Sequence, residues 1–126
     1  MLIIIEMDFI YITEGETMKI QQYGIQIGKL AAGTKNCITD VAGVQVGHVT
    51  LDYPLNEQGD VACTGVTAIL PHAGNIFREK VTAASYVLNG FGKTTGLVQV
   101  DELGVLESPI LLTNTFSVAA VTQGAL

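Results

Sequence analysis

Two adjacent carboxylates, Asp101 and Glu102, are the side chains of this sequence best suited to bind a charged ligand. They follow residues 95–100, a strand-like run that predicts a strand. Neighbouring side chains on a strand point to opposite faces, so only one of the two would enter a given cleft. A carboxylate there could hold a substrate ammonium through a charge-assisted hydrogen bond. The alternative is a solvated pair of turn carboxylates, and the residues alone leave both interpretations open.

Three other polar residues give weaker signals. His48 lies within a predicted strand and His72 follows Pro71, which ends another. Either imidazole could act as a general base, but no Ser or Cys has a suggestive spacing and no third ligand completes a metal set. Both are therefore predicted to be structural, and no metal or other cofactor is expected. Asn114, between two threonines, could orient a ligand amide or cap a following helix.

The segment Gly-Phe-Gly-Lys-Thr at residues 90–94 has the composition of a phosphate-binding loop. That motif needs a glycine five residues before its Gly-Lys pair, where this chain has Val87. It also needs a strand before it and a helix after it, whereas the pattern here predicts the reverse order. We therefore interpret the segment as a glycine-rich turn.

The elements that would position these residues are mostly short strands. A helix is predicted over residues 76–89, capped by Asn75 and ended at Gly90, because Phe77, Val81, Ala84 and Leu88 would share one face. A second helix is expected from Phe116. Together they predict an α/β or α+β class. The predicted strands are residues 2–5, 9–12, 44–51, 63–70, 95–100 and 109–113, with a polar loop over residues 52–60.

Composition restricts the function classes. The 126 residues suit one domain or part of one, 48% are hydrophobic, and the net charge of −6 argues against a nucleic-acid surface. Two distant cysteines are expected to be reduced thiols in a cytoplasmic protein. The apolar start is interrupted by Glu6 and Asp8, so neither a signal peptide nor a membrane span is expected.

The first 17 residues show a separate pattern. Glu14-Gly15-Glu16 just before Met18 is what a purine-rich ribosome-binding site would encode if it were translated in frame. We therefore hypothesise that residues 1–17 are a non-native extension and that Met18 is the natural start. Residues 18–126 would then form the native part of the sequence.

Four segments of the sequence occur in a recognisable order, at residues 36–50, 64–71, 89–96 and 102–115. Together they resemble the L-aminopeptidase/D-esterase family, also called the DmpA-type or β-aminopeptidase family. Ala42 stands where the family usually has proline. The resemblance implies a four-layer αββα sandwich related to ornithine acetyltransferases. Residues 18–126 would then form an incomplete hydrolase domain of this type. The resemblance further implies a precursor that cuts its backbone before a serine, which then attacks amide or ester bonds as the first residue of a β chain.

The resemblance also implies which parts of the site this chain carries. Ser85, Ser108 and Ser117 do not match the family's nucleophile, so we assign no catalytic residue and expect an inactive N-terminal fragment of the α chain. In the family an acidic residue binds the substrate's free amino group, and Glu102 or Asp101 matches that region. The remaining candidates for substrate binding are Phe91 and Leu103, which could line the pocket for the substrate's side chain, and Asn114.

The expected partners follow from the same resemblance. They are a peptide or amino-acid amide substrate and the remainder of the α and β chains. Without that remainder, exposed apolar faces and strand edges favour a homo-oligomer. The alternatives are a truncated, non-catalytic module that binds amines or a partner chain, and an acyltransferase of the ornithine acetyltransferase type.

Overall fold

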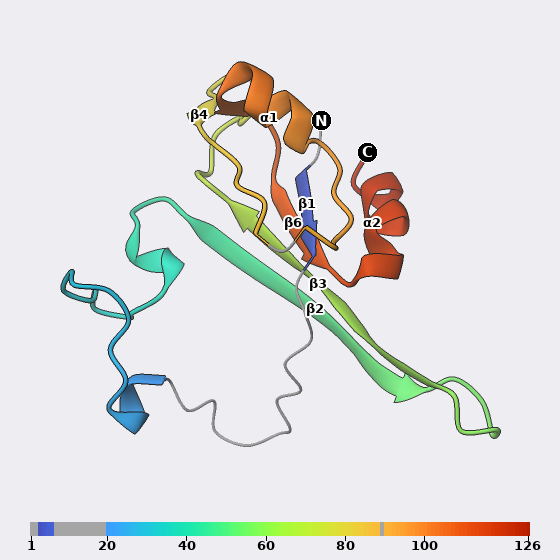
Figure 1. Ribbon diagram of the computed structural model, residues 1–126. Helices are drawn as coiled ribbons and strands as arrows, with labels where there is room; N and C mark the ends of the chain where they lie inside the picture. Colours follow the sequence, from blue (N-terminus) through green and yellow to red (C-terminus); the bar gives the residue numbers. More distant parts are fainter. Residues whose placement is uncertain (1–2, 7–19, 89) are drawn as a thin grey trace.

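The computed structural model describes residues 3–6, 20–88 and 90–126, and it is a mixed α/β fold around a four-stranded sheet (Figure 1). The strands are β1 (Ile3–Glu6), β2 (Gln45–Pro54), β3 (Val61–Leu70) and β6 (Ile110–Thr113). They stand in the order β1-β6-β3-β2, with β1 parallel to β6 and the other neighbours antiparallel. The mixed class expected from the sequence is confirmed.

The β2–β3 hairpin is the longest element, and Figure 1 shows it as an arm that extends beyond the rest of the sheet. Its register pairs Gln45 with Leu70 and continues without interruption to Pro54 and Val61. In the connecting loop, Asn56 donates from Nδ2 to the Asp60 carboxylate at 2.7 Å. The two strands predicted on either side of a polar loop are confirmed, and both extend further toward the loop than predicted.

The helix predicted over residues 76–89 is wrong. Asn75 does accept a hydrogen bond at Oδ1 from the Arg78 backbone N–H, at 3.0 Å, but only one turn forms. The chain then enters β4 (Val81–Thr82), which pairs antiparallel with β5 (Val105–Leu106). Both β4 residues are β-branched, and pairing with a distant strand outweighs the helical spacing.

The strand predicted over residues 95–100 is also wrong, because the helix α1 (Leu97–Leu103) occupies most of it. Gly96 and Gly104 flank this helix with φ angles of +95° and +66°, a conformation that glycine adopts without strain. Leu97 and Val100 pack into the core while Val98 is 84% exposed. The apolar residues thus follow helical spacing, not strand alternation.

Two small hydrophobic clusters lie on opposite faces of the sheet. Leu111 and Val118 form one, and Val100 and Leu106 form the other with Ile110 packed against them. Because side chains alternate along a strand, the β6 neighbours Ile110 and Leu111 point to opposite faces. The exposed large apolar side chains of the described residues include Val49, Leu51 and Tyr53. Many large apolar side chains of the described residues are therefore exposed.

The C-terminal part of the structure agrees with the elements predicted from the sequence. The strand predicted over residues 109–113 is confirmed as β6, and the helix expected from Phe116 is present as a 3-10 turn (Thr115–Ser117) followed by α2 (Val118–Gly124). Val118 and Val121 pack against the sheet at Leu111, Val66 and Ala68. This contact anchors α2 to one face of the sheet.

The N-terminal part contributes β1 and two 3-10 turns, Ile20–Tyr23 and Ile38–Asp40. The strand expected over residues 2–5 agrees with β1, whereas the one expected over residues 9–12 lies outside the described residues. The hypothesis that residues 1–17 are non-native stays a prediction. Across the described ranges, every helix is too short or too polar to cross a bilayer.

Two glycines of the hairpin provide a matched test of the sheet geometry. A Cβ at Gly65 would lie 2.5 Å from the Val49 backbone oxygen, whereas one at Gly47 would meet no atom within 4 Å. We expect Gly65→Ala to lower the free energy of unfolding by about 1.5 kcal/mol, because the neighbouring strand must shift. Gly47→Ala should change it by less than about 0.5 kcal/mol. Urea denaturation followed by circular dichroism measures both, and equal values for the two variants would contradict this geometry.

Candidate substrate-binding site

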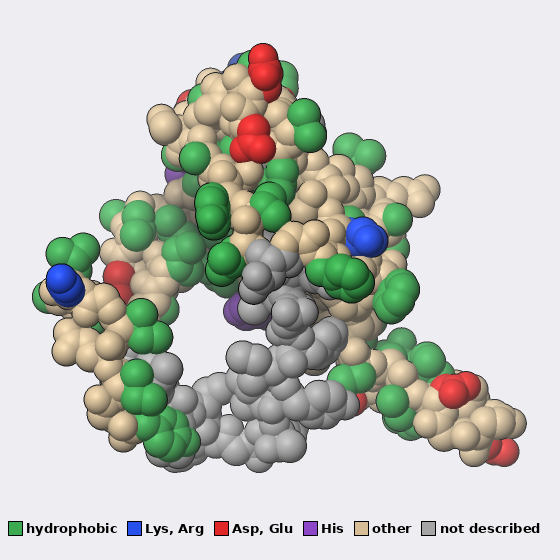
Figure 2. All heavy atoms as spheres, viewed as in Figure 1, with side chains coloured by type: hydrophobic (Ala, Val, Ile, Leu, Met, Phe, Trp, Pro, Cys, Tyr) green, Lys and Arg blue, Asp and Glu red, His purple; other side chains and the backbone are tan. Residues whose placement is uncertain are grey.

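The helix α1 carries both candidate carboxylates near its C-terminal end. Asp101 and Glu102 are exposed, and in Figure 2 acidic side chains stand at the end of the molecule where Figure 1 shows α1. On a helix, consecutive side chains point about 100° apart rather than to opposite faces. The sequence predicted that only one of the two carboxylates could enter a given cleft, because it placed them on a strand. That premise is wrong, since both lie on α1.

The two carboxylates differ in what they contact. Ser85 donates from Oγ to Asp101 Oδ1 at 2.5 Å, which joins the segment after β4 to α1. Within the described parts of the chain, no hydrogen bond or ion pair engages the Glu102 side chain. Asp101 therefore fixes the position of α1, while Glu102 keeps its acceptor capacity for another group. The strand pattern assumed from the sequence could not predict that, among the described residues, Asp101 has a partner and Glu102 has none.

A third carboxylate, Glu107, was not identified from the sequence, and it contacts α1 through Gln99. Gln99 donates from Nε2 to Glu107 Oε1 at 2.5 Å, and the Lys80 ammonium lies 3.4 Å from Glu107 Oε2. The Gln99 hydrogen bond, and after it Lys80, lower the pKa of Glu107 against the opposing effect of burial. Lys80 also donates to the Phe77 carbonyl oxygen at 2.5 Å. This network ties α1 to the segment before β4.

The two apolar candidates are both accessible to a ligand. Phe91 is 92% exposed in the irregular segment before α1, and Leu103 is 55% exposed at the end of that helix. The Lys93 ammonium lies 6.0 Å from the centre of the Phe91 ring. The glycine-rich segment around Phe91 contains neither a regular helix nor a strand, in agreement with the turn interpretation.

Asn114 follows β6 at the end opposite Ile110, the residue that packs against the cluster of Val100 and Leu106. Its Oδ1 accepts hydrogen bonds from the backbone N–H groups of Phe116 and Ser117, both at 3.0 Å. Its Nδ2 donates to Ser117 Oγ at 2.9 Å and to Thr64 Oγ1. Asn114 thus caps the C-terminal helical segment and connects it to β3. The structure does not bring it together with Glu102.

Both histidines have structural contacts. His48 Nδ1 lies 2.8 Å from Thr67 Oγ1 across the hairpin. His72 donates from Nε2 to the Glu79 carbonyl oxygen at 2.8 Å and accepts the Gly74 N–H at Nδ1. Over residues 3–6, 20–88 and 90–126, no three His, Cys, Asp or Glu side chains are grouped so that they could hold a metal ion.

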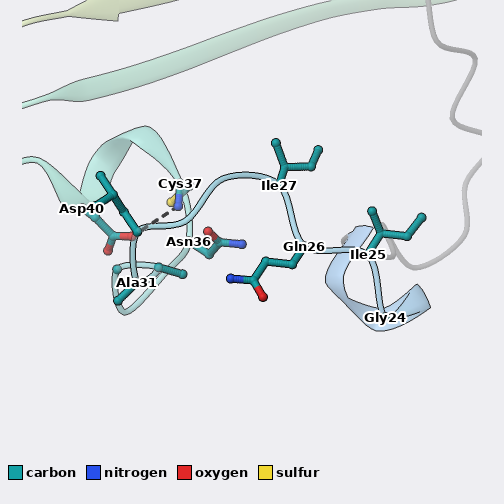
Figure 3. Close-up of a pocket in the computed structure, with 11 residues that line it drawn as sticks. Gly24, Ile25, Gln26, Ile27, Ala31, Asn36, Cys37 and Asp40 are labelled. Atoms are coloured by element: carbon teal, nitrogen blue, oxygen red, sulfur yellow. Dashed lines mark hydrogen bonds between the residues drawn. The ribbon is translucent and has the colours of Figure 1, made fainter.

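A cavity of about 710 Å³ lies away from α1, in the segment between residues 24 and 40 (Figure 3). Ile25, Ile27 and Leu30 line it together with Asp40, and none of the predicted site residues does so. The Asp40 carboxylate accepts the backbone N–H groups of Lys35 at 2.9 Å and of Cys37 at 3.2 Å. These bonds shape the loop, and the cavity does not correspond to the predicted site.

The same contacts predict a pH-dependent loop. The Lys35 backbone N–H is the main cause that lowers the pKa of Asp40 from its ordinary value of 3.8, and the Cys37 N–H adds to it against burial. Because the folded-state pKa is below the unfolded one, the carboxylate stabilises this loop above about pH 4, and the contribution is lost as the pH falls through the folded-state pKa. The Lys35 amide resonance should move with an apparent pKa below 3.8. Asp40→Asn should abolish that movement, and a transition above the ordinary value would contradict the assignment.

The profile of peptidase family S58 matches residues 36–126. The chain belongs to this family. It is 42% identical over 92 residues to beta-peptidyl aminopeptidase BapA of Sphingosinicella microcystinivorans, which covers 71% of this chain and 23% of that protein. The same-named protein of Sphingosinicella xenopeptidilytica is 42% identical over 97 residues, with 72% and 23% covered.

Solved structures of two relatives resemble the fold of this S58 family chain. The crystal structure of the PH0078 protein of Pyrococcus horikoshii OT3 matches with a TM-score of 0.75 and 51% identity, covering 86% of this chain and 31% of that one. A Burkholderia sp. beta-aminopeptidase matches with a TM-score of 0.76 and 44% identity, covering 86% and 30%. The chain spans less than a quarter of the length of the curated relatives that it matches.

Proposed function

We propose that this chain forms the N-terminal part of a self-processing aminopeptidase that releases N-terminal amino acids from peptides, amides or esters. The observation that carries the proposal is the match of residues 36–126 to peptidase family S58. The 42% identity to two beta-peptidyl aminopeptidases supports it. In this proposal the chain forms one wall of the substrate cleft, and the nucleophilic serine belongs to polypeptide downstream of residue 126.

Glu102 is the residue that we propose to bind the free amino group of the substrate. It is exposed on α1 with no partner in the described segments, whereas Asp101 already accepts a hydrogen bond from Ser85. A carboxylate with free lone pairs forms charge-assisted hydrogen bonds with an ammonium group, and these are stronger than neutral ones. Phe91 and Leu103 would line the pocket for the first side chain, because both are apolar and exposed.

The complete fold in this proposal is the four-layer αββα sandwich, with the described sheet as one of its two central layers. The support is the uncovered apolar surface on β2, where Val49 and Tyr53 are 63% and 48% exposed. Burying such surface is the main favourable term in folding. The remaining α and β chains would cover it, and a homo-oligomer in the cytoplasm completes the proposal.

The test is expression of the gene's whole reading frame. We expect mass spectrometry to find two chains, the second beginning with serine, and we expect amino acids to be released from amides that carry a free amino group. The 126-residue chain alone should show no turnover, and turnover by it would refute the downstream nucleophile. Binding of amines without hydrolysis would favour the non-catalytic module, and acetyl transfer to glutamate would favour the acyltransferase.

A further inference from the structure

The outer edge of β2 is unpaired among the described residues, since β3 is the single neighbour of β2 in the sheet order. Leu55 follows β2, and its backbone N–H bonds across the hairpin to the Asp60 carbonyl oxygen at 2.8 Å. Because backbone groups alternate in direction along a strand, the odd-numbered residues of β2 face β3. The even-numbered residues therefore direct their N–H and C=O groups outward. Pro54, which has no N–H, occupies one of these outward positions, as expected for an edge strand.

The side chains of this edge divide into two faces. Val49, Leu51 and Tyr53 point to one face and are 63%, 41% and 48% exposed. His48 and Asp52 point to the other face and are also exposed. Figure 2 shows hydrophobic side chains along the projecting arm and acidic ones at its tip. A two-stranded ribbon with an apolar face is marginally stable in water on its own, so this arm gains by further pairing.

We propose that β2 pairs antiparallel with β2 of a second copy of this chain, around a twofold axis at Thr50. In this register His48 lies opposite the partner's Asp52, and Val49 lies opposite the partner's Leu51. Gly47 then lies opposite the partner's Tyr53, whose ring covers the glycine in an arrangement known to stabilise sheet edges. The inference concerns assembly and does not depend on the proposed aminopeptidase activity.

Chemical complementarity selects this register over its neighbours. An axis at His48 would place that residue opposite itself, and an axis at Asp52 would place two like charges in direct contact, which destabilises a strand pair. An axis at Val49 or Leu51 leaves Asp52 opposite an uncharged residue. A register offset by a single residue would oppose outward to inward backbone groups and exchange the two faces.

The contacts within the hairpin leave His48 able to make the proposed bond. Its Nδ1 is already 2.8 Å from Thr67 Oγ1, and Nε2 has no partner in the described part of the structure. Nε2–H can therefore donate to the partner's Asp52. The outward N–H and C=O groups of Thr50 would bond to those of the partner's Thr50, as in a hydrogen-bonded antiparallel pair.

Cross-linking tests the register directly. In a chain carrying Cys37→Ser and Cys63→Ala, Thr50→Cys places two thiols on the axis, with Cα atoms about 5.5 Å apart. His48→Cys is the matched control, because its two thiols would be separated by four residues along the strand, roughly 14 Å. Dibromobimane joins two thiols when each sulfur displaces one bromide. We expect a product of twice the 13.3 kDa chain mass for Thr50→Cys and little for His48→Cys. Equal yields for the two variants would overturn the register.

Sedimentation of variants with native cysteines tests the pairing without a cross-linker. At about 100 μM, where a contact of micromolar Kd is nearly saturated, the unmodified chain should be a dimer. Asp52→Lys should weaken the dimer about tenfold, and His48→Glu combined with Asp52→Lys should restore it, because the charges remain paired in reverse. Circular dichroism checks that each variant stays folded. A monomeric unmodified chain, or a double variant as weak as Asp52→Lys, would refute the proposal.

Discussion

Replacing Glu102 with Gln in the longer, processed protein should lower kcat/KM about 30-fold for substrates with a free amino group. The variant keeps the size of the side chain and removes the negative charge that would accept the ammonium hydrogen bonds. Asp101→Asn should have a smaller effect, because Asp101 already accepts the Ser85 hydroxyl at 2.5 Å and contributes chiefly to the position of α1. Steady-state kinetics with a chromogenic amino-acid amide measures both variants.

A substrate analogue without the amino group is the control for the Glu102 prediction. If Glu102 binds the ammonium, the unmodified enzyme and Glu102→Gln should hydrolyse the analogue at similar rates, since the interaction is absent in both cases. An equal loss on both substrates would mean that Glu102 supports the structure of α1 and does not bind the amine. A larger loss for Asp101→Asn would reverse the roles of the two carboxylates.

Val100→Ala should lower the free energy of unfolding by about 2 to 3 kcal/mol, from lost burial of two methyl groups and the cavity left behind. Val100 is 3% exposed in contact with Leu106, whereas Val98 on the same helix is 84% exposed. Val98→Ala should therefore change the stability by less than about 0.5 kcal/mol. Denaturant unfolding measures both values.

The pair of valine variants also tests the secondary structure. On a strand, positions 98 and 100 share a face, so both substitutions would have similar effects. On a helix they point about 200° apart, so the effects should differ strongly. Similar losses at Val98 and Val100 would favour the strand predicted from the sequence over the observed α1.

The hairpin and β6 could be predicted from the sequence because local signals agree there. Apolar and polar residues alternate over residues 49–53 of β2, and β-branched residues recur along β3. A polar loop separates the two strands, and Pro71 ends the second. The helix predicted over residues 76–89 is wrong because the spacing of apolar residues is a local property. The strand β4 forms instead by pairing with β5, from a distant part of the chain. For residues 97–103 the apolar window was too short to separate a period of two from one of 3.6.

The candidate site was predictable in residue type and not in geometry. Adjacent carboxylates at Asp101 and Glu102 could be recognised as ligands for a cation, but the Ser85 contact that distinguishes them spans sixteen residues of sequence. The role of Glu107 could not be predicted, because its partners Lys80 and Gln99 approach it only after α1 and β5 have formed. Asn114 could be placed at a helix start, although its bond to Thr64 in β3 could not.

The parallel pairing of β1 with β6 has a consequence for the order of folding. Ile3 aligns with Ile110, so these strands meet only after nearly the whole described chain has been made. The β2–β3 hairpin, by contrast, closes a short loop and loses little chain entropy in doing so. The hairpin can therefore assemble while synthesis continues. Among the described strands, β1 is therefore made first and pairs with β6 last.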